Sequence, residues 1–517
     1  MSLSKPTMSA IRFGYGIRPG EEPPDGPDAL LAQLEKARGA KLRFPPEGIE
    51  GRLRTIAEMN VQARRARSSA GDDKAMKKSN MRPIRRDSYH IFGNDQHLRV
   101  AQSAFSPYGF HERLATFWTD HFSVSARKQR VMGLYTALYE AEAIRPNMTG
   151  SFSQLLSKAI THPAMLLYLD QARSIGPNSR RGKRADKGLN ENLGRELLEL
   201  HTLGVNGGYT QQDVHDAALI LTGLWANRHT GEFQFKMPIA EPGPLKLLGK
   251  TYGGRRRSIR DAEAMFADLA VMPQTGKHIC RKLAIHFVSD KPPEDLIKAM
   301  TAAWASSDGN LMAVYTAMLK HPAAWDNPGE KARQPYDYVV AGLRALDIPE
   351  KALAMPKRPQ DGDDEDDAAP DVPAVTMAAK SSDKNSMKMA DSEDADDQEA
   401  DMEDKKAKKK GMRLRPPMNR ITVGAINRLG QPIWQPSSPA GYDESFDAWI
   451  SSSQITGRIE WAQRVSGRYT GQLDPDALLK AVMREAARDD TIAIVRQAPN
   501  RATGMALALA SPEFNRR

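Results

Sequence analysis

The sequence has almost no cysteine, no long apolar stretch and none of the common catalytic signatures. Cys280 is the only cysteine in 517 residues, which excludes an intramolecular disulfide and a zinc site built from several cysteines. No run reaches the ~18 apolar residues of a membrane-spanning helix. The Gly-x-Ser-x-Gly elbow, the Walker loop and the Rossmann fingerprint are also missing. The usual motifs for acyl transfer, nucleotide binding and dinucleotide binding therefore predict no activity.

Charge is plentiful, and its distribution is uneven. The net charge is +10, but residues 361–404 hold 17 Asp and Glu against three Lys, a local net of −14, so the rest of the chain sums to +24. Such a basic body attracts anionic polymers or surfaces. No groove-reading motif accompanies the charge, so we expect no specific nucleic-acid recognition. The basic residues gather in four clusters, within 64–67, 77–86, 180–184 and 255–257.

The pattern predicts a mainly α protein with a minor β element and a disordered acidic insertion. With 40% apolar residues the chain can bury a large core. We expect four parts: an N-terminal helical segment with a basic loop over 1–86, a central helical core over 87–356, a disordered acidic and basic insertion over 357–417, and a C-terminal helical segment over 418–517. Within them, 68–86 is expected as a loop, 210–227 as a helix opened by a capping box, and 231–237 as a strand.

The stretch 190–204 carries the densest set of polar side chains. On an ideal helix Asn192, Glu196 and Glu199 share one arc, whereas His201 projects to nearly the opposite side. Glu199 and His201 therefore do not converge on one metal from a straight helix, and metal binding stays open. The plainer alternative is an ordinary surface pairing in which Arg195 bridges Glu191 and Glu199.

A second candidate lies in the stretch 111–122. Helical projection places His121 on one arc with Phe117, Trp118 and Phe122, which predicts a buried, hydrogen-bonded histidine. If a carboxylate such as Glu196 approached from another helix, His121 would become a plausible general base. The candidate catalytic residues are thus His121, Glu196, Glu199 and Asn192, and the sequence names no cofactor. Three further histidines, at 215, 278 and 286, are each readable as core or surface residues.

The motifs, taken in order, resemble the bacterial family called domain of unknown function 1800. The resemblance covers nearly the whole chain except the acidic insertion. It rests on Arg12-Phe-Gly-Tyr-Gly-Ile-Arg-Pro-Gly20, Phe117-Trp-Thr-Asp-His-Phe-Ser-Val-Ser125, the run 190–204, Gly207-Gly-Tyr-Thr210, Leu221-Thr-Gly-Leu-Trp225, Leu247-Leu-Gly249, Lys282-Leu283, Pro335, Leu343-Arg-Ala-Leu346 and Leu507-Ala-Leu-Ala-Ser-Pro-Glu-Phe514.

The resemblance implies a large helical protein, often encoded beside a member of the domain of unknown function 1501 family, and no proven catalytic residues. Many relatives carry a histidine where this chain has Thr119 and another where it has Ala240. These departures weaken any case for a shared histidine-rich metal centre.

Two function hypotheses follow. The leading one is a helical binding or assembly protein acting with a partner, on an exported or envelope-associated substrate. The alternative is an enzyme of undefined reaction that uses the His/Glu/Asn cluster, with or without a divalent metal. The first ten residues lack the zones of a secretory signal, which predicts a cytoplasmic protein by default. The partner family is often exported, so export with a partner is the alternative location.

Overall fold

The computed structural model describes residues 3–129, 131–184, 188–227, 230–254, 256–353, 420–469 and 474–517. The prediction of a mainly α fold with a minor β element is confirmed. The acidic insertion lies outside the described residues. The helices of the N-terminal half are α1 (Lys5–Met8), α2 (Pro27–Ala37), α3 (Gly48–Ser68), α4 (Lys74–Phe105), α5 (Gly109–His121), α6 (Met132–Tyr139), α7 (Phe152–Thr161), α8 (Pro163–Tyr168), α9 (Asn192–Glu196) and α10 (Gln211–Leu221).

Two small antiparallel hairpins interrupt the helical chain. The strands are β1 (Leu224–Ala226) paired with β2 (Phe233–Phe235), and β3 (Leu245–Leu247) paired with β4 (Lys250–Tyr252). The later helices are α11 (Ile259–Val271), α12 (Pro273–Phe287), α13 (Glu294–Ser306), α14 (Leu311–Lys320), α15 (Pro335–Ala345), α17 (Val423–Arg428), α18 (Ser452–Arg468), α19 (Pro475–Val482), α20 (Asp489–Arg496) and α21 (Arg501–Ala510).

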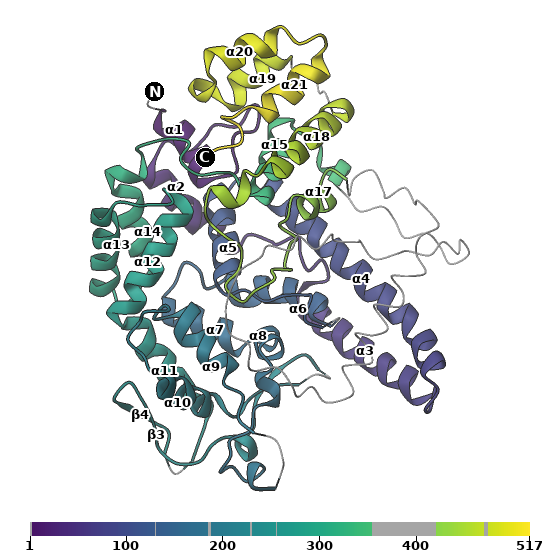
Figure 1. The fold of residues 1–517 in the computed structure, drawn as a ribbon, viewed down its shortest axis with the longest axis vertical. Coiled ribbons are helices and arrows are strands. Elements are labelled where there is room, and N and C mark those ends of the chain that lie inside the picture. The colour runs from purple at the N-terminus through teal and green to yellow at the C-terminus, as the bar shows by residue number, and fades with distance from the viewer. Residues whose placement is uncertain are drawn as a thin grey trace.

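The buried apolar side chains form two clusters. The larger one contains side chains from α2 and from the helices α5 through α14. The smaller one contains side chains from the C-terminal half of α4, from α15 and from the helices α17 through α21. Figure 1 shows α18 to α21 gathered at one end of the molecule, with α11 to α14 along one side. The smaller cluster thus combines residues from the predicted central and C-terminal parts. The four-part division itself stays a prediction.

Helices α3 and α4 pack side by side and project from the body as a helical hairpin, here called the arm (Figure 1). The stretch 68–86, expected to be a loop, is helical from Lys74 onward. The Asp73 side chain caps α4 by accepting a hydrogen bond from the Met76 N–H at 3.0 Å, and the alanine, methionine, lysine and arginine residues that follow favour helix. Charge alone was therefore a poor guide to loop structure here.

The helix opened by Thr210 has the expected capping box with Asp213 but ends at Leu221, six residues before the predicted end. Thr222 adopts an extended backbone (φ −59°, ψ 142°) and Gly223 a left-handed one (φ 99°), so the chain turns into β1. The predicted strand over 231–237 is confirmed as β2.

A group of four buried charges, each with an oppositely charged partner, joins α4, α5 and the π-helix η2 (Glu140–Ile144). This charged quartet consists of Arg99, Glu112, Glu140 and Arg145. Arg145 donates to Glu112 at 2.8 Å and to Glu140 at 3.0 Å, and Arg99 donates to Glu140 at 2.7 Å. The indole N–H of Trp434 also donates to Glu140, at 2.7 Å. The quartet therefore ties the C-terminal part of the chain to the N-terminal helices.

Candidate functional site

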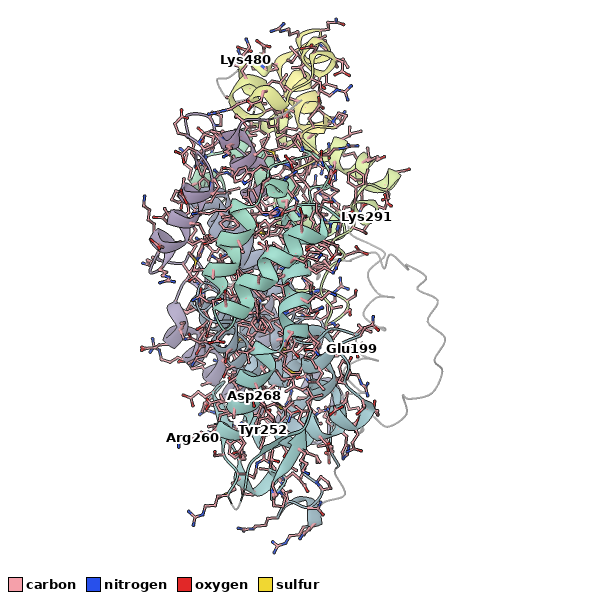
Figure 2. All side chains as sticks on the ribbon, turned by 90° about the vertical axis from the view of Figure 1, so that its left-hand side faces the viewer. Glu199, Tyr252, Arg260, Asp268, Lys291 and Lys480 are labelled. Atoms are coloured by element: carbon pink, nitrogen blue, oxygen red, sulfur yellow. The ribbon has the colours of Figure 1, made fainter. Side chains whose placement is uncertain are left out.

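The polar residues of 190–204 divide between the surface and the core. Asn192 is exposed, and Glu196 and Glu199 are half-buried. Glu199 lies near the margin of the molecule in Figure 2. Burial, and then the charge of Glu199, raise the pKa of Glu196 to about 7, and Arg195 opposes the shift. The structure thus places Glu196 and Glu199 close enough to repel each other, as the helical projection predicted.

The surface pairing around Arg195 differs in detail from the expected bridge. Arg195 lies 3.7 Å from Glu191 and donates to Gln211 at 2.9 Å. Glu191 in turn accepts from His215 at 2.8 Å. These contacts are partly exposed and hold α9 against α10. Such pairs contribute at most about 1 kcal/mol each to stability.

His201 lies inside the molecule, at the end of a segment in which the helix changes its winding. Residues Leu197–His201 form a π-helix, η5, directly after α9. Such wide turns occur often at functional sites. The His201 side chain is fully buried, and its ring centroid lies 5.8 Å from that of His121. The prediction that His121 is a buried, hydrogen-bonded histidine is confirmed, with 2% of it exposed.

Three imidazoles meet at this point, and each is hydrogen-bonded to a backbone carbonyl. His121 Nε2 donates to the His201 carbonyl at 3.4 Å, and His201 Nδ1 donates to the His121 carbonyl at 3.2 Å. His278 Nε2 donates to the Leu200 carbonyl at 3.1 Å. A backbone carbonyl requires an N–H, so these bonds set the tautomer of each ring. His121 Nδ1 and His201 Nε2 are left buried with no partner among the described residues.

All three rings are neutral at pH 7. Burial, then the positive charge of Lys282, hold the pKa of His121 well below its ordinary value. The same causes lower the pKa of His201 to about 3 and that of His278 to about 4. A neutral imidazole with one bare nitrogen accepts a proton or a hydrogen bond. The arrangement therefore supplies hydrogen-bond acceptors rather than cations.

Lys282 stands between these rings and two carboxylates. It lies one turn after His278 and one turn before His286 on α12, so the three side chains form one stripe. No acceptor among the described residues lies within hydrogen-bonding distance of its ammonium group. Burial lowers the pKa of Lys282, whereas Asp120 and Glu444 oppose that shift.

Asp120 and Glu444 supply the acidic side of the centre. Burial, and then the charge of Glu444, raise the pKa of Asp120 to about 7, while Lys282 opposes the shift. Asp120 accepts from the Tyr442 N–H at 3.0 Å, and Gly441 packs so closely on its carboxylate that no Cβ fits there. Burial opposes ionisation of Glu444, yet His286 and nearby cations hold its pKa below the ordinary value. The pKa of Asp120 is therefore raised, whereas the pKa of its neighbour Glu444 is lowered.

The two carboxylates line a small cavity between α5, α12 and the segment 431–444. Ser123 Oγ, Thr119 Oγ1 and Glu444 Oε2 also belong to its lining residues, and all three atoms lack a partner among the described residues. Buried polar atoms of this kind are normally satisfied by water or a ligand. We name the seven residues Asp120, His121, His201, His278, Lys282, His286 and Glu444 the polar centre.

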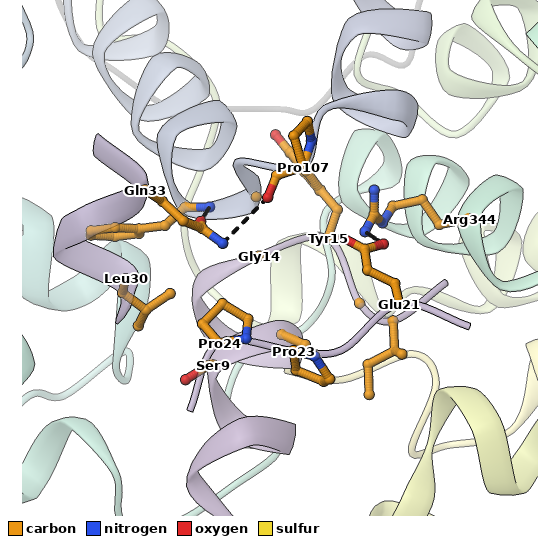
Figure 3. A pocket seen from close by; sticks show the side chains of 15 residues that line it. Ser9, Gly14, Tyr15, Glu21, Pro23, Pro24, Leu30, Gln33, Pro107 and Arg344 are labelled. Atoms are coloured by element: carbon orange, nitrogen blue, oxygen red, sulfur yellow. Dashed lines mark hydrogen bonds and ion pairs between the residues drawn. The ribbon is translucent and has the colours of Figure 1, made fainter. Parts of the chain in front are cut away.

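A second pocket lies beside the N-terminal segment, α2 and Pro107 (Figure 3). Its charged side chains are Glu21 and Arg344, which pair with each other at 2.5 Å, and Gln33 donates to the Pro107 carbonyl at 3.3 Å. This pocket therefore offers no free acid or base. The polar centre is the better candidate because its titratable groups have shifted pKa values and several buried polar atoms there lack a hydrogen-bond partner among the described residues.

The structure assembles the site from residues that the sequence interpretation only partly identified. His121 is present, but its hydrogen-bond partner is His201 rather than Glu196 or Glu199. Asp120, Lys282 and Glu444 were missed. The spacing of His278, Lys282 and His286 every four residues was visible in the sequence and marked one face of α12, but nothing in the sequence placed Glu444 beside it.

The described residues contain no group of three or more His, Cys, Asp or Glu side chains placed to hold a metal ion. No described helix is long and apolar enough to cross a membrane.

Comparison with known proteins gives one match. No curated protein and no solved structure is significantly similar to the chain. The family model described as "Protein of unknown function (DUF1800)" matches residues 9–516. That match includes every residue of the polar centre and both helices of the arm. The chain therefore belongs to the DUF1800 family.

Proposed function

We propose that the protein is a binding or assembly protein that acts with an anionic partner, and that the end of the arm is its docking surface. One observation carries the proposal: two of the four basic clusters meet there. Residues 61–90 hold nine Lys and Arg against three Asp, a net charge of +6. Asn80 donates to the Ala66 carbonyl at 3.3 Å, which fixes the ends of α3 and α4 beside each other.

Five cations define this surface, which we call the arm tip: Arg64, Arg65, Arg67, Lys77 and Lys78. All but Lys77 are exposed, and none has an ion-pair partner among the described residues. By contrast, Arg257 of the 255–257 cluster is buried and donates to the Ile220 carbonyl at 2.8 Å. Clustered exposed cations speed association with an anionic partner and set its orientation. A protein of the domain of unknown function 1501 family is the partner that the family resemblance favours, with an exported or envelope-associated substrate.

Charge reversal at the arm tip tests the proposal. We expect the combined change Arg64→Glu, Arg65→Glu, Lys77→Glu and Lys78→Glu to abolish co-purification of a co-expressed domain of unknown function 1501 protein. The matched control reverses four exposed cations elsewhere: Lys246, Arg260, Lys291 and Lys298. If both variants retain the partner equally, the arm tip is not the docking surface.

The polar centre favours a second candidate, an enzyme of undefined reaction. His121 is a candidate because a carbonyl sets its tautomer and its other ring nitrogen is left to accept a hydrogen bond from a substrate. Lys282 and Asp120 add an amine and an acid whose pKa values are shifted towards neutrality. The half-buried Glu196, Glu199 and exposed Asn192 form a separate acidic patch that remains a candidate for the same role.

Elemental analysis of the purified protein separates the two candidates. A stoichiometric divalent metal that is lost in the Glu196→Gln variant would support the enzyme. A metal-free protein that keeps a stable partner would support binding and assembly.

A further inference from the structure

We propose that the arm tip also binds the acidic residues 361–404 of its own chain, so that an outside partner must displace them. This inference rests on the proposed function, because it names what occupies the same docking surface before the partner arrives. Charge complementarity and the positions of the chain ends support it.

The charges of the two segments are complementary. The acidic segment carries a net of −14 over 44 residues, and the arm carries +6 over residues 61–90. The acidic residues are concentrated in two blocks, with six in 361–367 and six in 391–399. Two such blocks match a surface on which cations from two adjacent helices lie side by side. Exposed opposite charges attract over about 8–10 Å at physiological salt.

The chain leaves and re-enters the described structure at the C-terminal half of α4, which is the base of the arm. The 3-10 helix η8 (Glu350–Leu353) packs against α4, and α17 packs against α4 on the return. Thr422 Oγ1 lies 3.3 Å from His97 Nδ1 of α4. From His97 back to Lys78 the helix covers roughly 30 Å at 1.5 Å per residue.

The connecting chain is long enough to reach the arm tip. An extended chain covers about 3.3 Å per residue, so the 14 residues from Leu353 to Asp367 span roughly 45 Å. Tethering also raises the local concentration of the acidic segment to about the millimolar range. A weak electrostatic contact is therefore sufficient to occupy the arm tip in the isolated protein.

A peptide titration on the full-length protein tests the inference. The probe is a fluorescent synthetic peptide of residues 361–404. In one variant the twelve Asp and Glu of 361–367 and 391–399 become Asn or Gln, which reduces the segment's net charge to −2. We expect this variant to bind the peptide at least tenfold more tightly than the wild type at 50 mM NaCl, because its own arm tip is vacant. The difference should disappear at 1 M NaCl, where the screening length is about 3 Å.

A further variant combines the neutralised segment with the arm-tip reversal of Arg64, Arg65, Lys77 and Lys78. This combination is expected to abolish peptide binding. The control reversal of Lys246, Arg260, Lys291 and Lys298 should leave the binding intact. Carbodiimide cross-linking of the wild type adds a direct readout, since it should join Lys77 or Lys78 to carboxylates of 361–404 independently of protein concentration.

Failure of this inference is distinguishable from failure of the proposed function. If the neutralised variant and the wild type bind the peptide equally while the arm-tip reversal abolishes that binding, the tethered segment does not occupy the arm tip, and the docking surface stands. If the arm-tip and control reversals bind the peptide alike, both ideas are wrong. Circular dichroism of every variant ensures that the comparison is among folded proteins.

Discussion

The charged quartet and the polar centre are both buried and both rich in charge, yet they differ in how those charges are satisfied. In the quartet each charged group has a direct partner at 3.0 Å or less. In the polar centre the Lys282 ammonium has none among the described residues, and two imidazole nitrogens are bare. Burying charged groups costs free energy in both places, but only the quartet offsets this cost with short hydrogen bonds between opposite charges.

The difference separates structural from chemical roles. Arg145 and Glu140 hold three helices and Trp434 together. Asp120, by contrast, has a pKa of about 7 and lies beside an amine whose pKa is lowered. Groups that have shifted pKa values and no ion-pair partner are often found at binding and catalytic sites.

Arg145→Met should break the quartet. It leaves Glu112 and Glu140 buried without their shared cation, and we expect a loss of about 3–5 kcal/mol in the free energy of unfolding. Urea denaturation followed by circular dichroism measures the loss. Arg281→Gln, which removes the exposed pair with Glu294, is the control and should cost no more than about 1 kcal/mol. Equal losses in the two variants would mean that the quartet is not structurally special.

Asp120→Asn should change how stability depends on pH. Because the folded pKa of Asp120 is raised to about 7, the unfolded state binds fewer protons than the folded state between about pH 4 and pH 7. The wild type should therefore lose stability relative to the variant as pH rises through that window, by at most about 1.4 kcal/mol per pH unit, and the difference should be constant above it. Thermal and urea unfolding at pH 4.5, 6 and 8 check the sign, and a flat difference would contradict the raised pKa.

Lys282→Met should have little effect on stability and a clear effect on Asp120. The ammonium has no hydrogen bond to lose, and its removal relieves the cost of burying a charge, so we expect a change within about 1 kcal/mol at pH 6. Since Lys282 favours the ionised form of Asp120, the pH window seen in the previous experiment should move upward. The exposed Lys298→Met is the control. A destabilisation as large as that of Arg145→Met would place Lys282 with the structural charges.

Glu196→Gln should have the smallest effect. The change removes repulsion from Glu199 three residues away, so we expect a gain of about 0.2–0.5 kcal/mol at pH 8 that fades as pH falls towards 4. Partner binding should be unaffected if the acidic patch is only surface. Loss of partner binding or activity without loss of stability would instead make Glu196 a functional residue, and a pull-down and a thermal scan on one preparation decide between these outcomes.

Local features of the sequence predicted much of the fold. The capping box at Thr210 marks a real helix start, and the alternation over 231–237 marks β2. The errors are equally local: Thr222 and Gly223 end a helix early, and a charge-rich stretch proved helical because Asp73 caps it and α3 packs beside it. Helix starts depend on nearby hydrogen bonds, whereas helix ends and long solvated helices depend on what packs against them.

The amino-acid sequence was sufficient to predict the helical class, the family, the burial of His121 and the opposition between a basic body and an acidic insertion, because composition, periodicity and short motifs are properties of neighbouring residues. The surroundings of His121 depend on tertiary packing. His201 comes from the π-helix η5, Lys282 comes from α12, and Glu444 lies more than 150 residues after His286 in the chain. Such contacts depend on how distant helices pack, and helical projection of one segment contains no information about its neighbours.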